Sequence, residues 1–340
     1  MPKNNKLTAA KTAKRDEFFT RYIDIEREMS HYHTQLRDKT IFCDCNDFCS
    51  EFWRFFAQNF DVIGLRGLIA TSYTHETKGQ AYKLEMWRDD AGAPLPTVRT
   101  PLKGNGDFRS PECVELLKKC DVVVTNPPFS LLREFVAQLV QNNKQYLIVG
   151  NQNAVTYRDV FPLIKNNRMW LGFGFKGGAA HFINRDYEDY AIASDHREGM
   201  IRVSGVVWLT NIQHSKRNEP LQLTQRYADD PRKYPKYDNY RAINVNKTAD
   251  IPGDYDGVMG VPITFLDRYC PSQFEILGAT ESEGRGFSGG LWDAASGVTQ
   301  PVVDGKRIYK RLFIRRRIGE CNSKVKNPYT LDGHDYRFEK

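Results

Sequence analysis

Apolar residues follow two different spacings along the first half of the chain. Short apolar runs of strand length are separated by segments whose apolar residues recur every three or four positions, as on one face of a helix. The predicted strands span residues 40–44, 66–71, 121–125 and 145–150. The predicted helices span residues 16–32, 48–59, 110–119 and 131–141. This order predicts an α/β fold with a mostly parallel, doubly wound sheet up to about residue 165.

Less regular segments complete this picture. In the first predicted helix, Tyr22, Ile23, Ile25, Met29 and Tyr32 fall roughly on one face. Ser110 is a plausible cap for the helix at 110–119. Further elements are predicted as a small antiparallel excursion at 82–87, a weak helix at 155–165, and strands at 169–175, 181–184 and 203–210.

The composition changes after Ile212. Residues 213–240 are polar, with tyrosines among prolines and charges, and glycine-rich turns recur at 253–260 and 284–290. We therefore predict three parts: a flexible basic tail at 1–15, an α/β domain at 16–212, and an irregular, mixed α/β region at 213–340.

The stretch at 121–130, with the sequence DVVVTNPPFS, carries the most specific signal. Its valines form a continuous apolar run, which is typical of a strand covered on both faces. Pro127 and Pro128 cannot extend a strand ladder, so they end the strand and stiffen the turn. Asn126 and Phe129 are thereby expected at the carboxyl edge of the sheet, where open α/β folds bind their ligands.

This arrangement suits methylation of a conjugated amine. The lone pair of an aromatic NH2 group is delocalised, so the nitrogen is a poor nucleophile. The Asn126 side-chain oxygen and the Pro127 carbonyl could accept hydrogen bonds from its two N–H groups and favour a pyramidal nitrogen. Phe129 would stack on the base. The alternative is that Asn126 only caps the following helix. The tetrapeptide also occurs in enzymes that methylate protein glutamine or RNA guanine, so it does not name the substrate.

Charge and cysteine content narrow the functional class. The chain has 340 residues, a formal net charge of +7 and seven cysteines. An odd number of cysteines in a chain of this length favours reduced thiols in a cytoplasm. No apolar run approaches the roughly 18 residues of a membrane span, and the basic N-terminus lacks the apolar core of a secretory signal.

A basic stretch at 306–317 predicts a polyanionic partner. Seven cations alternate with apolar residues and no acid intervenes: Lys306, Arg307, Lys310, Arg311, Arg315, Arg316 and Arg317. Such a strand would bury one side and lay its cations along phosphates. The alternative is a solvated edge strand whose charges prevent aggregation.

Two other groups of residues are better explained by core packing than by a functional site. Cys43, Cys45 and Cys49 lie near His31 and His33, but their spacing does not match paired zinc ligands. We predict no metal site and expect the Cys43 side chain to point into the sheet core. In the aromatic stretch at 170–175, a second ring could sandwich a base, although core packing is the favoured interpretation.

Several motifs, in the same order along the chain, resemble the adenine-specific DNA methyltransferases of the EcoRI type. In the first half they are DEFFT (16–20), DIE (24–26), HY (31–32), CDCND (43–47), LIATSY (68–73) and NPPF (126–129). In the second half they are YPKYDNY (234–240), AINV (242–245) and YDGVMGVPITFL (255–266).

The resemblance implies a function and a fold. It implies S-adenosylmethionine as methyl donor, N6 of a flipped-out adenine in double-stranded DNA as acceptor, and a cytoplasmic bacterial or phage modification role with a possible cognate restriction endonuclease. The implied fold is α/β: a Rossmann-like S-adenosylmethionine-dependent methyltransferase sheet in the catalytic domain at 16–212, with a C-terminal mixed α/β target-recognition region at 213–340.

The resemblance also assigns roles to individual residues. The catalytic turn that would hold the flipped adenine comprises Asn126, Pro127, Pro128 and Phe129. The residues expected near the cofactor are Phe19 and Thr20 at its methionine end, Asp107 and Phe108 at its adenine, and Cys43, Asp44, Cys45 and Asp47 where the first strand ends.

The chain departs from methyltransferases at large in one place. The glycine-rich turn that usually follows the first strand is replaced by CNDF at 45–48, so the backbone approaches a cofactor less closely. Glu76 is the candidate for the acidic residue that binds the ribose. The rival interpretations are a methyltransferase acting on RNA or protein glutamine, and a catalytically silent DNA-binding relative.

Overall fold

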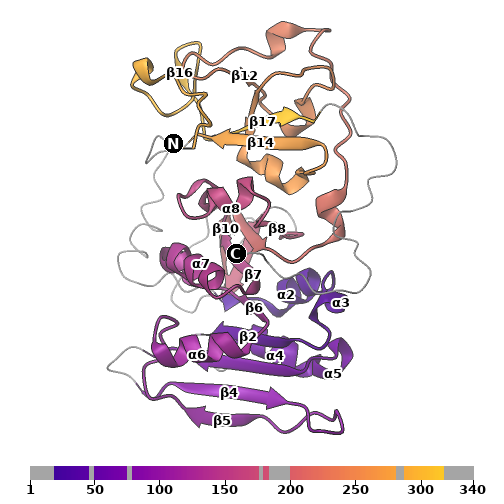
Figure 1. Ribbon diagram of the computed structural model, residues 1–340, viewed down its shortest axis with the longest axis vertical. Helices are drawn as coiled ribbons and strands as arrows, with labels where there is room; N and C mark the ends of the chain where they lie inside the picture. The colour runs from indigo at the N-terminus through magenta and orange to yellow at the C-terminus, as the bar shows by residue number, and fades with distance from the viewer. Residues whose placement is uncertain are drawn as a thin grey trace. The chain divides into compact units, whose positions relative to one another are not determined.

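The computed structural model describes residues 19–45, 50–74, 79–175, 179–183, 200–280 and 287–317, with the side chains of residues 44 and 45 excepted. The chain divides into two compact units, Met1–Arg217 and Asn218–Lys340 (Figure 1). Among the described residues, no helix has both the length and the apolarity needed to cross a bilayer.

An eight-stranded mixed sheet forms the centre of the first unit, in the order β5-β4-β3-β2-β6-β7-β11-β8. Its strands are β2 (Thr40–Cys45), β3 (Gly67–Ser72), β4 (Tyr82–Trp87), β5 (Val98–Pro101), β6 (Val122–Thr125), β7 (Gln145–Asn151), β8 (Trp170–Leu171) and β11 (Val206–Thr210).

Only the middle of this sheet is parallel. β3, β2, β6 and β7 run parallel to one another, whereas β4, β5, β11 and β8 join through antiparallel pairs. The prediction of a mostly parallel sheet is therefore correct for the centre and wrong for both sides. The antiparallel excursion at 82–87 is confirmed as β4.

The strand order changes direction at β2. The chain passes from β2 to β3 on one side and then returns to pair β6 on the other side of β2. Such a switch point leaves a crevice outside the carboxyl ends of the two diverging strands, which is where open α/β sheets bind ligands. In this sheet, the carboxyl ends of β2 and β6 flank that position.

Helices occupy the connections between the strands, as the sequence predicted. They are α2 (Tyr22–Met29), α3 (His33–Leu36), α4 (Glu51–Gln58), α5 (Phe60–Ile63), α6 (Pro111–Lys119), α7 (Leu132–Gln141) and α8 (Phe161–Lys165). The predicted cap is confirmed, since Ser110 Oγ accepts the Cys113 N–H at 3.2 Å. The first helix begins only at Tyr22, and Ile23, predicted on its apolar face, is 40% exposed.

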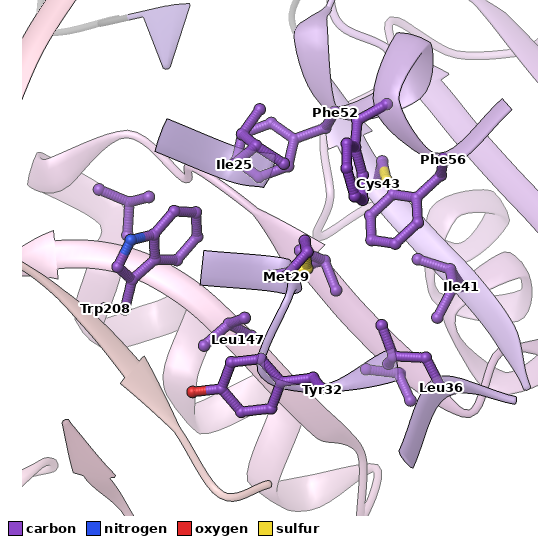
Figure 2. Packing of buried hydrophobic residues seen from close by; sticks show 14 of the residues in the cluster. Ile25, Met29, Tyr32, Leu36, Ile41, Cys43, Phe52, Phe56, Leu147 and Trp208 are labelled. Carbon is purple, nitrogen blue, oxygen red and sulfur yellow. The ribbon is translucent and has the colours of Figure 1, made fainter. Parts of the chain in front are cut away.

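One continuous core fills the space between the sheet and α2–α5. Ile25 and Met29 of α2 and Phe56 of α4 pack on Ile41 and Cys43 of β2 (Figure 2). Because successive strand residues point to opposite faces, Phe42, Val123 and Ile148 face the other side, where they are also buried. Both faces of the central strands are therefore covered, as the apolar run at 121–125 predicted.

Two predicted strands are shorter or divided in the structure. The stretch at 203–210 covers the end of β10 (Met200–Ser204) and all of β11, which are separated by Gly205 at φ +70°. β10 belongs to a separate sheet, β1-β9-β10, in which β1 is Phe19–Thr20 and β9 is Ala179–Ile183. The stretch at 169–175 forms a strand only over β8.

The predicted weak helix at 155–165 is interrupted. Its first part belongs to the 3₁₀ segment η2 (Gln152–Thr156), and α8 begins five residues later, at Phe161. The weak helical pattern of the sequence agrees with this short break.

The second unit contains a four-stranded sheet with the order β12-β13-β17-β14. Its strands are β12 (Ile243–Asn244), β13 (Met259–Pro262), β14 (Phe274–Ala279) and β17 (Arg311–Arg316), and a hairpin adds β15 (Val302–Val303) and β16 (Lys306–Arg307). Tyr237, Tyr240 and Phe313 form a buried aromatic cluster. In the described part of this unit the helical segments are short 3₁₀ turns, so the predicted mixed α/β character is wrong there.

Candidate active site

The NPPF segment follows directly on β6. The strand is fully buried through Thr125, and Asn126 is half-buried immediately after it. Phe129 opens the 3₁₀ turn η1 (Phe129–Leu131), which leads into α7. The residues that cap η1 and α7 are Pro128 and Leu131, and neither cap involves a side-chain hydrogen bond. Asn126 therefore occupies neither of these two capping positions.

The N-terminal strand and the NPPF turn meet at β9. The Phe129 ring lies 6.5 Å from the Phe182 ring at an interplanar angle of 78°. Phe182 is also the register partner of Thr20 in β1. Thr20 is buried, and its hydroxyl finds no hydrogen-bond partner in the described structure. A buried hydroxyl without a partner is costly, so Thr20 is well suited to bind a polar ligand group.

The loop at 104–108 packs on the carboxyl end of β3. Gly106 has φ +81°, and a Cβ atom there would lie 1.9 Å from the Ser72 carbonyl oxygen. The Thr74 N–H donates to the Asn105 carbonyl at 2.8 Å, which fixes the loop from the other side. Only glycine permits this close approach. The loop therefore holds Asp107 close to the carboxyl end of β3, the strand that pairs with β2.

Asp107 and Phe108 are joined to α7, the helix that follows the NPPF turn. The Phe108 ring contacts Phe135 edge-on at 5.1 Å, and the Gln138 side chain donates to the Phe108 carbonyl at 2.9 Å. The Arg109 side chain donates to both Asp107 oxygens, at 2.9 and 2.7 Å. These hydrogen bonds from Arg109 are the main reason that the pKa of Asp107 is lowered. Asp107 is therefore an ionised acceptor at neutral pH.

The end of β2 lies beside the end of β3, with Asp44 opposite Thr71 and Cys45 opposite Ser72. The Cys43 side chain is fully buried in the core. Its predicted orientation is thus confirmed, but the same burial means that it offers no surface to a cofactor. Asp47 and Glu76 lie outside the described residues. Within the described ranges, no three potential metal ligands come together.

The aromatic stretch at 170–175 packs inward, as the favoured interpretation predicted. Phe175 stacks on Trp208 at 5.5 Å with an interplanar angle of 9°, and it lies 6.4 Å from Phe182. Phe173 stacks on His31 at 3.5 Å. Of these two rings, Phe175 therefore supports the aromatic packing behind Phe129.

Sequence reasoning missed two charged residues of this unit. Arg109 forms ion pairs with Asp107 and Glu134. Its position two residues after Asp107 does not mark it in the sequence as a site residue. Glu28 is 1% exposed and accepts the N–H groups of Phe173 and Gly174 at 2.8 and 2.9 Å. The sequence did indicate Glu28, because an acidic residue on the apolar helix face of Ile25 and Met29 is expected to be buried and paired.

The predicted DNA-binding stretch lies in the second unit. The stretch forms two strands: β17 has neighbours on both sides, so the alternative of a solvated edge strand is wrong there, whereas β16 is an exposed strand of a two-stranded sheet and fits that alternative. Lys306, Arg307, Arg315 and Arg317 are exposed, and Lys310 and Arg316 are half-buried.

Arg311 differs from the other six cations of this stretch. It is buried, and its guanidinium donates to the Tyr309 carbonyl at 2.8 Å and to Asn244 at 3.3 Å. Arg311 therefore stabilises the sheet instead of offering a charge to a partner, which corrects the prediction for this residue.

Comparison with known proteins shows a family match over most of the chain. A family described as adenine-specific methyltransferase EcoRI matches residues 6–317. The chain is 45% identical over 289 residues to the Type II methyltransferase M.EcoRI of Escherichia coli, covering 81% of this chain and 89% of that protein.

Two further relatives come from mycoplasmas. The Type II methyltransferase M.MgeORF184P of Mycoplasma genitalium is 37% identical over 91% of this chain and 98% of its own length. M.MpnI of Mycoplasma pneumoniae is 35% identical over 91% of this chain and 97% of its own length. No solved structure shows significant similarity. The match over most of the chain establishes that this protein belongs to the EcoRI family of adenine-specific methyltransferases.

Proposed function

We propose that this protein transfers a methyl group from S-adenosylmethionine to N6 of an adenine flipped out of double-stranded DNA. The observation that carries the proposal is the convergence at the switch point of the sheet. Asn126 and Pro127 follow β6 there, and the loop carrying Asp107 packs on β3. The central strand order and the family membership support a Rossmann-like methyltransferase sheet.

In this proposal, Asn126 and Pro127 act on the adenine amine directly. The Asn126 side-chain oxygen and the Pro127 carbonyl accept hydrogen bonds from its two N–H groups. This favours a pyramidal nitrogen with its lone pair directed at the methyl group. Phe129 stacks on the base and fixes its plane, while Pro128 keeps the turn rigid. A neutral amide suffices, because the amine proton leaves easily once the nitrogen carries the methyl group.

The residues of the first unit fit the methyl donor. The partnerless hydroxyl of Thr20 would bind its methionine end beside Phe19, which is 38% exposed. Asp107, next to Phe108, would accept a hydrogen bond from the adenine amine of the methyl donor. Asp44 and Cys45 would contribute further contacts to the donor at the end of β2. When bound, S-adenosylmethionine supplies an electrophilic methyl group on a positively charged sulfur.

The second unit would recognise the target sequence and clamp the DNA backbone. The exposed cations of β16 and those at the end of β17 provide charge for phosphates. The Type II names of the relatives support a modification role beside a cognate restriction endonuclease.

The function is tested by incubating the protein with S-adenosylmethionine and duplex DNA, then digesting the DNA and measuring N6-methyladenine by mass spectrometry. RNA and a glutamine-containing protein substrate are run in parallel. N6-methyladenine in DNA is the expected product. Methyl transfer only to RNA or protein would contradict the proposal, as would the absence of methylation of any substrate.

Replacing Thr20 by valine should weaken cofactor binding without destabilising the protein. The two side chains have nearly the same shape, and the lost hydroxyl has no hydrogen-bond partner in the described structure. We expect affinity for S-adenosylmethionine, measured by calorimetry, to fall by about tenfold, the effect of one hydrogen bond to a charged group. The thermal unfolding midpoint should stay equal or rise. Unchanged affinity would exclude Thr20 from the cofactor site.

Replacing Lys306 and Arg307 together by alanine should weaken DNA binding in a salt-dependent way. If each contacts a phosphate, the slope of log K against log salt should become less steep by about 2. Fluorescence anisotropy at several salt concentrations measures that slope. The matched variant, Arg311→Met, removes a buried cation, so it should lower thermal stability and leave the slope unchanged. If the Lys306/Arg307 double variant and the wild type show equal slopes, the assignment of these two residues to phosphate contacts is contradicted.

A further inference from the structure

A buried carboxylate on α2 holds a segment that is distant in sequence. Glu28 Oε1 accepts the Phe173 N–H at 2.8 Å and the Tyr32 hydroxyl at 3.0 Å. Its Oε2 accepts the Gly174 N–H at 2.9 Å. Gly172 approaches so closely that a Cβ atom there would lie 2.1 Å from Glu28 Oε1. Three donors and a glycine thus surround one side chain that is 1% exposed.

The segment that Glu28 holds leads to the aromatic packing at the candidate active site. Phe175 follows Gly174 directly and stacks on Trp208 at 5.5 Å. It also lies 6.4 Å from Phe182, and Phe182 in turn lies 6.5 Å from Phe129. A displacement of residues 172–175 would therefore change the support behind Phe129.

We propose that Glu28 is a positioning residue for methyl transfer, whose carboxylate holds residues 172–175 so that Phe175 and Phe182 support the Phe129 ring. This role rests on the proposed function, in which Phe129 stacks on the flipped adenine. Glu28 itself touches neither the base nor the methyl donor. It acts by accepting hydrogen bonds from the backbone N–H groups of Phe173 and Gly174. If β8 continued through these residues, the same N–H groups would be available to pair with a neighbouring strand.

Glu28 is the group in this cluster that changes charge near neutral pH. Burial raises the pKa of Glu28 to about 7, although its three hydrogen bonds and the charge of Lys216 oppose this. Burial also lowers the pKa of His31, lowers that of His214 to about 4, and raises that of Tyr32. These three groups are therefore mainly neutral at pH 7. Lys216 Nζ donates to the Phe173 carbonyl at 3.1 Å.

Ionisation of Glu28 has opposite effects on the segment and on global stability. A carboxylate is a stronger acceptor than a carboxylic acid, so the segment is held best above pH 7. The folded protein binds the Glu28 proton more tightly than the unfolded chain, because the pKa rises from 4.5 to about 7. The resulting stabilisation is full below pH 4.5 and is lost as the pH rises through 7. Transfer rate and stability should thus respond to Glu28 in opposite directions.

Glu28→Gln tests the proposal, with Glu26→Gln as the matched control on an exposed position of the same helix. A glutamine offers one acceptor oxygen, and its NH2 group would face a backbone N–H. At pH 8.5, we expect the single-turnover rate of Glu28→Gln to fall by roughly tenfold, the effect of hydrogen bonds to a charged group. The deficit should shrink at pH 6. The Glu26→Gln rates should match wild type at both pH values.

Hydrogen exchange measured by mass spectrometry gives a readout that does not depend on activity. In Glu28→Gln the amides of Phe173 and Gly174 should exchange faster than in wild type at the same pH, while its thermal midpoint at pH 8.5 stays equal or rises because a buried charge is gone. Gly172→Ala displaces the carboxylate from the other side, so it should reproduce the loss of rate. The double variant should be no slower than either single variant.

The possible failures are distinguishable. If wild type methylates DNA while Glu28→Gln keeps the wild-type rate and exchange, the role of Glu28 is overturned and the proposed function stands. A rate deficit that is identical at pH 6 and 8.5, with unchanged exchange at residues 173–174, also overturns it. If wild type methylates no DNA, the proposed function itself fails, whatever the exchange data show.

Discussion

Asn126→Ala is expected to reduce the rate of methyl transfer by about 10²–10³-fold, the effect of removing one preorganised polar contact from an active site. The alanine lacks the oxygen that would accept from the adenine amine, while the rigid prolines that follow it are unchanged. DNA affinity should stay within a few-fold of wild type, because this affinity depends mainly on phosphate contacts. Single-turnover assays measure the rate, and anisotropy measures the affinity.

The control for this variant is Asn166→Ala, at the exposed C-terminal cap of α8. It removes the same amide from an exposed position outside the segments assigned to the site, so the rate should be unaffected. The thermal midpoint of both variants is measured as well, so that a loss of rate can be separated from a loss of stability. Near-normal turnover by Asn126→Ala would show that the roles assigned to the NPPF turn are wrong.

Gly106→Ala is expected to have the largest effect on stability. The new Cβ atom would lie 1.9 Å from the Ser72 carbonyl oxygen, and φ of +81° is unfavourable for alanine. The backbone strain and the overlap together should cost about 3 kcal/mol of the free energy of unfolding. The Asp107 loop would move off β3, so affinity for S-adenosylmethionine should fall as well. Urea denaturation and calorimetry measure the two effects.

Gly104→Ala provides the matched comparison in the same loop. Gly104 has ordinary backbone angles, and no other atom lies within 4 Å of a Cβ atom built there. This variant should change the free energy of unfolding by about 0.5 kcal/mol at most. Equal behaviour of the two alanine variants would mean that the contact between Gly106 and Ser72 does not position the loop.

Local sequence patterns predicted the elements that form within one segment. The apolar run ending at Thr125, the prolines after it and the helix through Gln141 all occur as expected, because each follows from backbone propensity and burial. The Ser110 cap and the antiparallel strand at 82–87 have the same origin. Spacing of apolar residues also located α4 and α7, although the exact ends differed by a few residues.

Errors arose where distant segments compete for the same backbone groups. The stretch at 169–175 has a strand-like composition, yet the carboxylate of Glu28 takes the N–H groups of Phe173 and Gly174. The stretch at 203–210 reads as one strand, but Gly205 divides it between two sheets. Phe19 reads as the start of a helix, whereas it pairs with β9. None of these partners is near in sequence.

The amino-acid sequence by itself determined that a buried strand ends in NPPF at the edge of an α/β sheet, and that the chain carries the motifs of the EcoRI methyltransferase family. These features depend on short-range chemistry: apolar runs, proline geometry and the order of motifs. The tertiary structure decided which residues join that turn. It brought Thr20 to Phe182, Gly106 onto Ser72 and Glu28 to Phe173, because burial leaves polar groups to find partners wherever the packed chain places them.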